Sequence, residues 1–132
     1  MTVALHIMVA LAKNTPRRMP STELAKSVGA NPVTIRRVVA ALVDGGLVET
    51  QPGIGGGVAL TRTASSITVE QIHSAVGRPA WFKATNKPPY ELCSVSVCMP
   101  RVVQRLNEAI DCEAAKVMSG VTLQALVDEE IA

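Results

Sequence analysis

Aromatic residues are the scarcest feature of this sequence, since only Trp81, Phe82 and Tyr90 occur among its 132 residues. The core must therefore be built from Val, Ile, Leu, Ala and Met, and a small core of this kind often shares its burial with a second subunit. Apolar residues still make up 48% of the chain and charged residues 18%, which predicts a folded chain rather than a disordered one. The length suits one domain, or one small domain with a helical extension.

Cysteines and long apolar runs are also few. Three cysteines without a secretory signal argue against a disulfide framework. Residues 1–12 are apolar but have neither a basic leader nor a small-residue cleavage site. No run reaches the ~18 apolar residues that a membrane span needs. These absences predict a soluble, cytoplasmic protein with no membrane partner.

Positive charge is concentrated in the first half of the chain. Residues 1–66 hold seven Lys/Arg against three acids, a net charge of +4, whereas residues 67–132 hold six against eight, a net charge of −2. The basic half is therefore the candidate for binding a polyanionic partner.

Two consecutive helices are expected in this basic half. Ser21 provides an N-cap for a two-turn helix that ends at Gly29. Asn31 as N-cap and Pro32 at the first helical position begin another helix, which runs to Asp44. Because so few residues separate the two helices, they must turn sharply against each other, as in a helix-turn-helix.

A glycine-rich hairpin follows these helices. Residues 47–50 and 58–61 predict two short strands, and a hairpin directly after a helix-turn-helix is a wing. Thr68 then caps a fourth helix, closed by Gly77. The first helix of the chain is expected over residues 3–13, with apolar side chains nearly all round it.

The second half contains a long irregular segment and a long helix. Pro100 begins that helix, which is roughly 30 Å long and carries a narrow apolar seam typical of a helix with a partner helix. The expected fold is mainly α with a small β hairpin. It comprises a winged helix-turn-helix domain over residues 1–77, an irregular sensor or linker segment over 78–98, and a dimerisation helix with a short C-terminal helix over 99–132.

The outward face of the third helix is the candidate site. At 100° per residue Ile35 and Leu42 point inward, whereas Arg36 and Arg37 point outward. Arginines can bond guanine O6 and N7 or phosphates, and hydroxyls near helix amide ends suit phosphate. The alternatives are a solvated helix face and a module that binds a protein instead of DNA. The predicted DNA-binding residues are Ser21, Thr22, Asn31, Val33, Thr34, Arg36, Arg37, Gly55 and Gly56.

No catalytic or metal constellation is apparent. The glycine run after Pro52 lacks the Lys-Ser/Thr and the following helix that phosphate chemistry requires, so it predicts a turn. His6 and His73 have no second ligand one helical turn away, which predicts structural roles and no metal site. The protein is therefore not expected to be an enzyme.

Five stretches of the sequence resemble the Rrf2 family of bacterial winged-helix transcription regulators, which includes iron-sulfur, nitric-oxide and cysteine-metabolism regulators. The resemblance covers nearly the whole chain, although Val58 stands where the family often has an aromatic residue. It implies a homodimeric DNA-binding repressor or activator whose long helix forms the dimer interface. The matching stretches are TVALHIMVALA (2–12), STELAKSV (21–28), IRRVVAALVDGGLV (35–48), GIGGGVAL (53–60) and ITVEQIHSAV (67–76).

The three cysteines leave the signal open. Iron-sulfur members of the family present three closely spaced cysteines, whereas here Cys112 comes fourteen residues after Cys98. A 2Fe-2S cluster needs four ligands, so it would rest on Cys93, Cys98 and a ligand that the sequence does not identify.

A thiol switch is the alternative that the residues favour. Cys98 is expected just ahead of the long helix, where the helix amide end and Arg101 favour thiolate. Cys93 could resolve a sulfenic acid at Cys98 if the two Cα atoms approach within about 6.8 Å. The predicted redox-sensing residues are Cys93, Cys98 and Cys112. The competing interpretations are inert reduced cysteines and a small-molecule effector pocket lined by the three aromatic residues.

Overall fold

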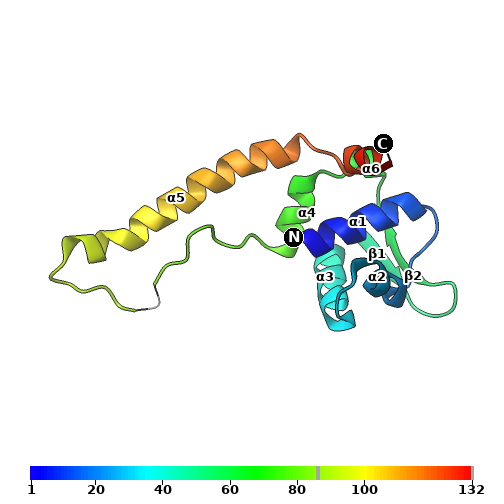
Figure 1. Cartoon of the computed structure of the whole chain (residues 1–132), viewed down its shortest axis with the longest axis horizontal. Coiled ribbons are helices and arrows are strands. Elements are labelled where there is room, and N and C mark those ends of the chain that lie inside the picture. The colour runs from blue at the N-terminus through cyan, green and yellow to red at the C-terminus, as the bar shows by residue number, and fades with distance from the viewer. Residues whose placement is uncertain (86, 132) are drawn as a thin grey trace. The chain divides into compact units, whose positions relative to one another are not determined.

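The computed structural model describes residues 1–85 and 87–131, with side chains described up to residue 129. It confirms a mainly helical chain with one small hairpin (Figure 1). Contacts divide the chain into two compact units: one combines residues 1–77 with the chain from Met118 onward, and the other is Arg78–Val117. The elements are α1 (Thr2–Asn14), α2 (Ser21–Val28), α3 (Pro32–Asp44), β1 (Val48–Gln51), β2 (Gly57–Leu60), the 3-10 helix η1 (Ala64–Ser66), α4 (Val69–Val76), α5 (Ser94–Ser119) and α6 (Leu123–Ile131).

Local capping sets the helix starts. The Asn31 side chain accepts a hydrogen bond from the Val33 amide at 2.8 Å, which confirms it as the N-cap of α3. Thr68 and Gln71 form a capping box at α4. The prediction that Ser21 caps α2 is wrong. Pro20 holds the N-cap position in an extended conformation, and its carbonyl accepts hydrogen bonds from the amides of Glu23 and Leu24.

The core of the first unit is aliphatic, as expected. Helix α1 lies at its centre and contacts α2, α3, α4, α6 and β2. Its side chains Ile7 and Met8 have no exposed surface, and neither do Leu24 of α2 and Ile35 of α3. Burial of α1 on several sides explains why its sequence is apolar nearly all round.

The wing contains one more strand segment than the sequence predicted. Strands β1 and β2 pair antiparallel from Val48 opposite Leu60 to Gln51 opposite Gly57. Met19 pairs with Val58 on the other edge of β2, through backbone hydrogen bonds of 2.9 and 2.8 Å. The chain between α1 and α2 is thereby fixed to the wing.

The C-terminal helix belongs to the winged unit. Leu123 of α6 is fully buried, and its amide donates to the Ile67 carbonyl at 2.8 Å. The Val69 amide donates to Val121 at 2.9 Å. The expected division, which grouped residues 99–132 into one dimerisation unit, is wrong from Met118 onward, because α6 completes the core beneath α1 and η1.

The long helix begins earlier than expected. It starts at Ser94, and Pro100 lies inside it rather than at its first position. The first turn is already closed by the Val97 amide, which donates to the Cys93 carbonyl at 3.1 Å. The irregular segment therefore ends at residue 93 rather than 98. No helix within the described residues is long and apolar enough to cross a membrane.

Candidate nucleic-acid interface

Helix α3 divides into a buried side and an exposed side. Ile35 and Leu42 are fully buried in the core, and Val39 is nearly so. Arg36 and Arg37 are exposed, as the helical projection predicts. Their guanidinium groups lie on the side of the helix that the core leaves uncovered.

A tight turn sets α2 against α3. Gly29 ends α2 with a φ of +71°, a left-handed conformation that glycine adopts without strain. The amides of Gly29 and Ala30 both donate to the Ala25 carbonyl, at 2.9 and 3.3 Å. Asn31 then caps α3 at once, so the two helices form the turn of a helix-turn-helix.

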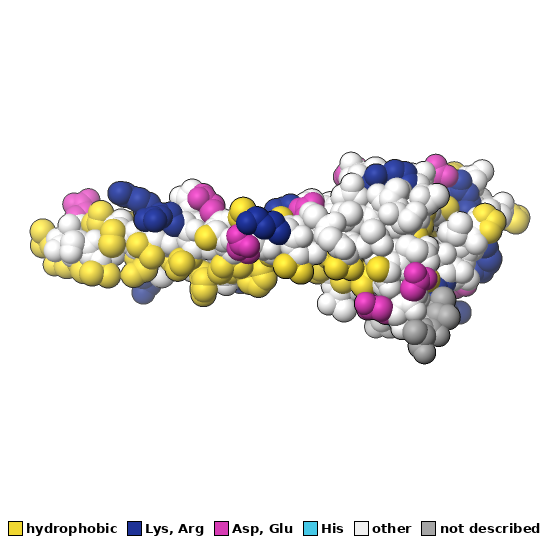
Figure 2. Space-filling model, turned by 90° about the horizontal axis from the view of Figure 1, so that it is seen from above, with side chains coloured by type: hydrophobic (Ala, Val, Ile, Leu, Met, Phe, Trp, Pro, Cys, Tyr) yellow, Lys and Arg dark blue, Asp and Glu magenta, His cyan; other side chains and the backbone are white. Residues whose placement is uncertain are grey.

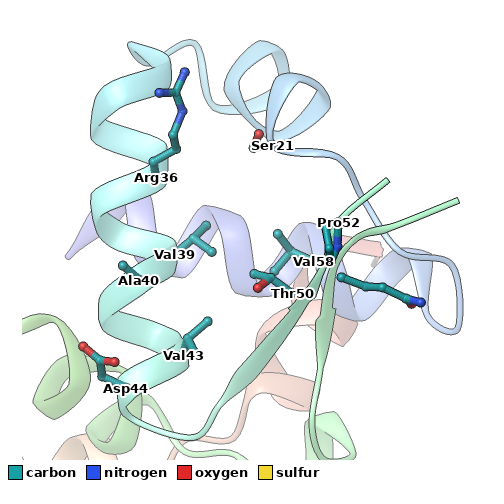
Figure 3. Close-up of a pocket in the computed structure, with 11 residues that line it drawn as sticks. Ser21, Arg36, Val39, Ala40, Val43, Asp44, Thr50, Pro52 and Val58 are labelled. Atoms are coloured by element: carbon teal, nitrogen blue, oxygen red, sulfur yellow. The ribbon is translucent and has the colours of Figure 1, made fainter. Parts of the chain in front are cut away.

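A groove of about 640 Å³ lies between α3 and the β1–β2 hairpin. Val39 and Val43 point from α3 toward the strands, where Thr50, Pro52 and Val58 line the other wall (Figure 3). Ser21, at the start of α2, and Arg36 lie at one end of the groove. The face formed by α3 and the wing is thus concave.

Ion pairs separate the arginines of this unit into two groups. Arg17 binds Glu23 through two hydrogen bonds of 3.0 and 2.6 Å, and Arg18 binds Glu49 at 2.6 Å. The hydrogen bonds from Arg17 hold the pKa of the Glu23 carboxyl below its ordinary value. Within the described residues, Arg36 and Arg37 have no hydrogen-bond or ion-pair partner. Their charges are therefore available to an external anion.

The other predicted DNA-binding residues occupy different environments. Thr22 is exposed, whereas Ser21 and Thr34 are half-buried. Asn31 is exposed, but its side-chain oxygen is already used as the cap of α3. Val33, in the first turn of α3, is 62% exposed. These residues lie close to the amino ends of α2 and α3.

The two predicted wing glycines differ in what they do. Gly55 is exposed, has a φ of +76° and would leave an added Cβ in open space. A Cβ at Gly56 would lie 2.1 Å from the Gln51 carbonyl oxygen, so the fold of the hairpin itself requires glycine at this position. The sequence interpretation missed Ile54, whose side chain is fully exposed at the hairpin tip. The sequence could have indicated this exposed side chain, because Ile54 is an apolar residue flanked by glycines in a predicted turn.

The cysteines do not lie where the thiol-switch interpretation needs them. Cys98 is inside α5, not ahead of it, and its thiol donates to the Val95 carbonyl at 3.4 Å. Cys93 precedes the first residue of the same helix. Five helical positions separate Cα atoms by about 8.7 Å, beyond the ~7 Å that a disulfide can bridge. The expectation that Cys93 resolves an oxidised Cys98 within one chain is therefore wrong while this turn stays helical.

The donor set does not fit an iron-sulfur cluster within one chain. Cys112 lies fourteen residues beyond Cys98 on α5, which is about 21 Å along the helix axis. Among the described residues no three His, Cys, Asp or Glu side chains come together as metal ligands. The Nε2 atom of His6 instead lies 3.0 Å from the Ser27 hydroxyl, in hydrogen-bond contact.

Two of the three aromatic residues bind the irregular segment to α5. The Trp81 indole donates to Asp111 at 2.8 Å. The Phe82 backbone exchanges two hydrogen bonds with the Asn107 side chain, both of 2.9 Å. Tyr90 lines a separate hollow of about 600 Å³ near the start of α5.

A helix-turn-helix followed directly by a hairpin, with unpaired arginines on the second helix, defines a winged-helix protein of the DNA-binding class. The chain belongs to the Rrf2 family. The sequence model of that family, described as an iron-dependent transcriptional regulator, matches residues 1–129. The protein is accordingly a transcriptional regulator and not an enzyme, as the sequence predicted.

Individual relatives are distant. YffB of Lactococcus lactis, named an HTH-type transcriptional regulator, is 26% identical over 130 residues, which cover 96% of this chain and 83% of YffB. YwnA of Bacillus subtilis, named likewise, is 23% identical over 110 residues, covering 83% of this chain and 80% of YwnA. The crystal structure of a Lactobacillus plantarum transcriptional regulator shares the fold with a TM-score of 0.78 and 21% identity, covering 95% of this chain and 85% of that one.

Proposed function

We propose that this chain is a homodimer that binds operator sites in double-stranded DNA, with α3 in the major groove and the wing against the flanking backbone or minor groove. The observation that carries the proposal is the exposed, unpaired state of Arg36 and Arg37. A guanidinium that has no protein partner keeps all its donors for phosphate or guanine. A regulator of this kind acts in the cytoplasm, where bacterial DNA is accessible.

Groups around α3 supply contacts to the DNA backbone. Ser21 and Thr22 bring hydroxyls to the amino end of α2, where backbone amides also face outward. At the wing, Gly55 is exposed and Ile54 offers an apolar tip, and the sequence from residue 50 to 61 contains no Lys or Arg. Phosphate contacts and their salt dependence should therefore come mainly from α2 and α3.

The long helix α5 supports a homodimer. None of its side chains is buried, although it is 26 residues long. Leu106 and Val117 are 48% and 70% exposed, and with Ile110 and Trp81 they line an apolar hollow of about 450 Å³. Figure 2 shows apolar side chains side by side along this part of the chain. A second copy of α5 would cover this stripe. In such a dimer each copy of α3 is proposed to enter one of two successive major grooves, which are about 34 Å apart in DNA.

The test is DNA binding by a variant that lacks both arginines. Duplexes selected by the wild-type protein from a randomised pool serve as the probe, and affinity is measured at several salt concentrations. Arg36→Ala/Arg37→Ala should weaken binding by about 1–3 kcal/mol for each arginine that contacts a base. The matched control, Arg101→Ala/Arg105→Ala, removes the same charge from α5. Wild-type affinity and salt dependence in the α3 variant would refute the role of Arg36 and Arg37, and failure of the wild-type protein to retain any duplex would favour a protein-binding module.

Redox control is a second candidate function, favoured by the exposure of the thiols of Cys98 and Cys112. An exposed thiol can react with peroxide to give a sulfenic acid and water, without a second cysteine nearby. Mass spectrometry after peroxide treatment, together with operator release, tests this. An oxidant response that persists in both Cys98→Ser and Cys112→Ser would exclude these thiols as the sensor.

A further inference from the structure

We infer that the exposed face of α3 contacts base pairs through the major-groove edges of guanine and thymine, and not through those of adenine or cytosine. In this arrangement Arg36 and Arg37 bind guanine, and Val33 contacts the C5-methyl group of thymine. The inference rests on the proposed function and adds to it the chemical class of operator that the protein selects.

The first observation is the make-up of the face. Val33, Arg36, Arg37 and Ala40 are spaced i, i+3, i+4 and i+7, so they form one stripe along α3. All four are exposed. Val33 is 62% exposed and belongs to the first turn, the part of a recognition helix that contacts base edges. A branched apolar side chain this exposed contributes little to the core of its own unit.

The chemistry of that stripe limits which bases it can distinguish. Guanine presents two acceptors, O6 and N7, in the major groove, and thymine presents a methyl group beside O4. The stripe offers guanidinium donors and aliphatic carbons, which match these two patterns. Adenine N6 and cytosine N4 are donors and need an acceptor from the protein, so a guanidinium can make one hydrogen bond to adenine, at N7, but two to guanine. None of the four side chains of the stripe carries one.

Acceptors close to the stripe are occupied or distant. The Asn31 side chain could accept from adenine N6 only through its Oδ1 atom, which already accepts the Val33 amide at 2.8 Å. Asp44 continues the stripe one turn beyond Ala40, but it lies about 16 Å along the axis from Val33, outside the amino-terminal turns that contact base edges. The Thr34 hydroxyl is half-buried, and a hydroxyl can pair with more than one base.

The test starts from duplexes selected by the full-length protein from a randomised pool. Each thymine of the selected site is then replaced in turn by deoxyuracil, which removes the methyl group and nothing else. Replacement at the position that Val33 contacts should weaken binding about fourfold, the effect of one buried methyl group. Replacing a contacted guanine by 7-deazaguanine should weaken binding severalfold, because it removes the N7 acceptor.

Two variants connect the effect to its residue. In Val33→Ala the uracil effect should shrink at one position, because both γ-methyl groups are gone. In Val97→Ala, which alters an exposed valine of α5, it should persist. These exposed substitutions leave the fold intact, and circular dichroism checks this.

The possible results separate the inference from the proposed function. Tight, selective binding with no effect of uracil or 7-deazaguanine would overturn the inference and leave the DNA-binding function standing. Failure to retain any duplex from the pool, even at low salt, would overturn both.

Discussion

Replacing Gly57 by alanine should destabilise the winged unit more than its size suggests. Gly57 has a φ of +131°, where an L side chain is strained at a cost of about 1–3 kcal/mol. A Cβ there would lie 2.7 Å from the Met19 carbonyl carbon and oxygen and 3.0 Å from the Pro20 nitrogen. Because these atoms are backbone, the added methyl group must push the Met19 segment away from β2, at a further cost of about 1–3 kcal/mol.

The predicted total is a loss of about 2–6 kcal/mol, against the ~5–15 kcal/mol of stability typical of a domain. Urea unfolding followed by circular dichroism, at one fixed protein concentration, measures it. Gly53→Ala is the matched control, because Gly53 also has a positive φ, +89°, but a Cβ there would have no neighbour within 4 Å. That variant should show the strain without the clash.

Equal losses in Gly57→Ala and Gly53→Ala, to within about 0.5 kcal/mol, would refute the reasoning. Such a result would mean that the Met19 segment is not held against β2. A larger loss in Gly57→Ala should also weaken DNA binding at temperatures where the variant remains folded, since the same contact fixes the entry to α2 relative to the wing.

Three further predictions concern a cap, the long helix and an ion pair. Thr68→Ala should lower the free energy of unfolding by about 1 kcal/mol by removing the capping box of α4, and an unchanged urea midpoint would contradict that role. Ile110→Glu places a charge on the apolar stripe of α5 and should convert a dimer to a monomer in sedimentation, whereas Gln104→Glu, on an exposed part of α5, should not. Because Arg17 lowers the folded-state pKa of Glu23, the unfolded state binds more protons on acidification. This pair should therefore stabilise the fold at pH values above the ordinary pKa of a glutamate side chain, and that stabilisation should be lost as the pH falls. Glu23→Gln should show a flatter dependence of the unfolding free energy on pH.

Sequence patterns predicted α3 well because its signals are local. A cap at Asn31, a proline at the first position and glycines after Asp44 all act within a few residues of the helix ends. The exposure of Arg36 and Arg37 followed from the helical period alone. Local signals failed at α5, where Pro100 was interpreted as the first residue of the helix. The sequence alone does not distinguish a proline at the first helical position from a proline in the second turn, which is where Pro100 lies.

The remaining features depend on residues far apart in the chain. Pairing of Met19 with Val58 joins two segments whose individual sequences give no sign of each other. The Arg18–Glu49 ion pair likewise joins a loop to β1. The sequence does not show which arginines form such pairs, so it could not show that Arg36 and Arg37 would stay unpaired. Burial of Leu123 depends on the whole winged core having formed.

The return of α6 to the winged unit makes residues 78–117 an insertion in that unit rather than an appendage to it. A chain truncated after Gly77 would not form a stable DNA-binding domain, because the core would lack the buried side chain of Leu123. The inserted helix is also tethered at two junctions, one on each side of it. Residues 78–117 are therefore joined to the winged unit through two covalent connections, one following α4 and one preceding α6.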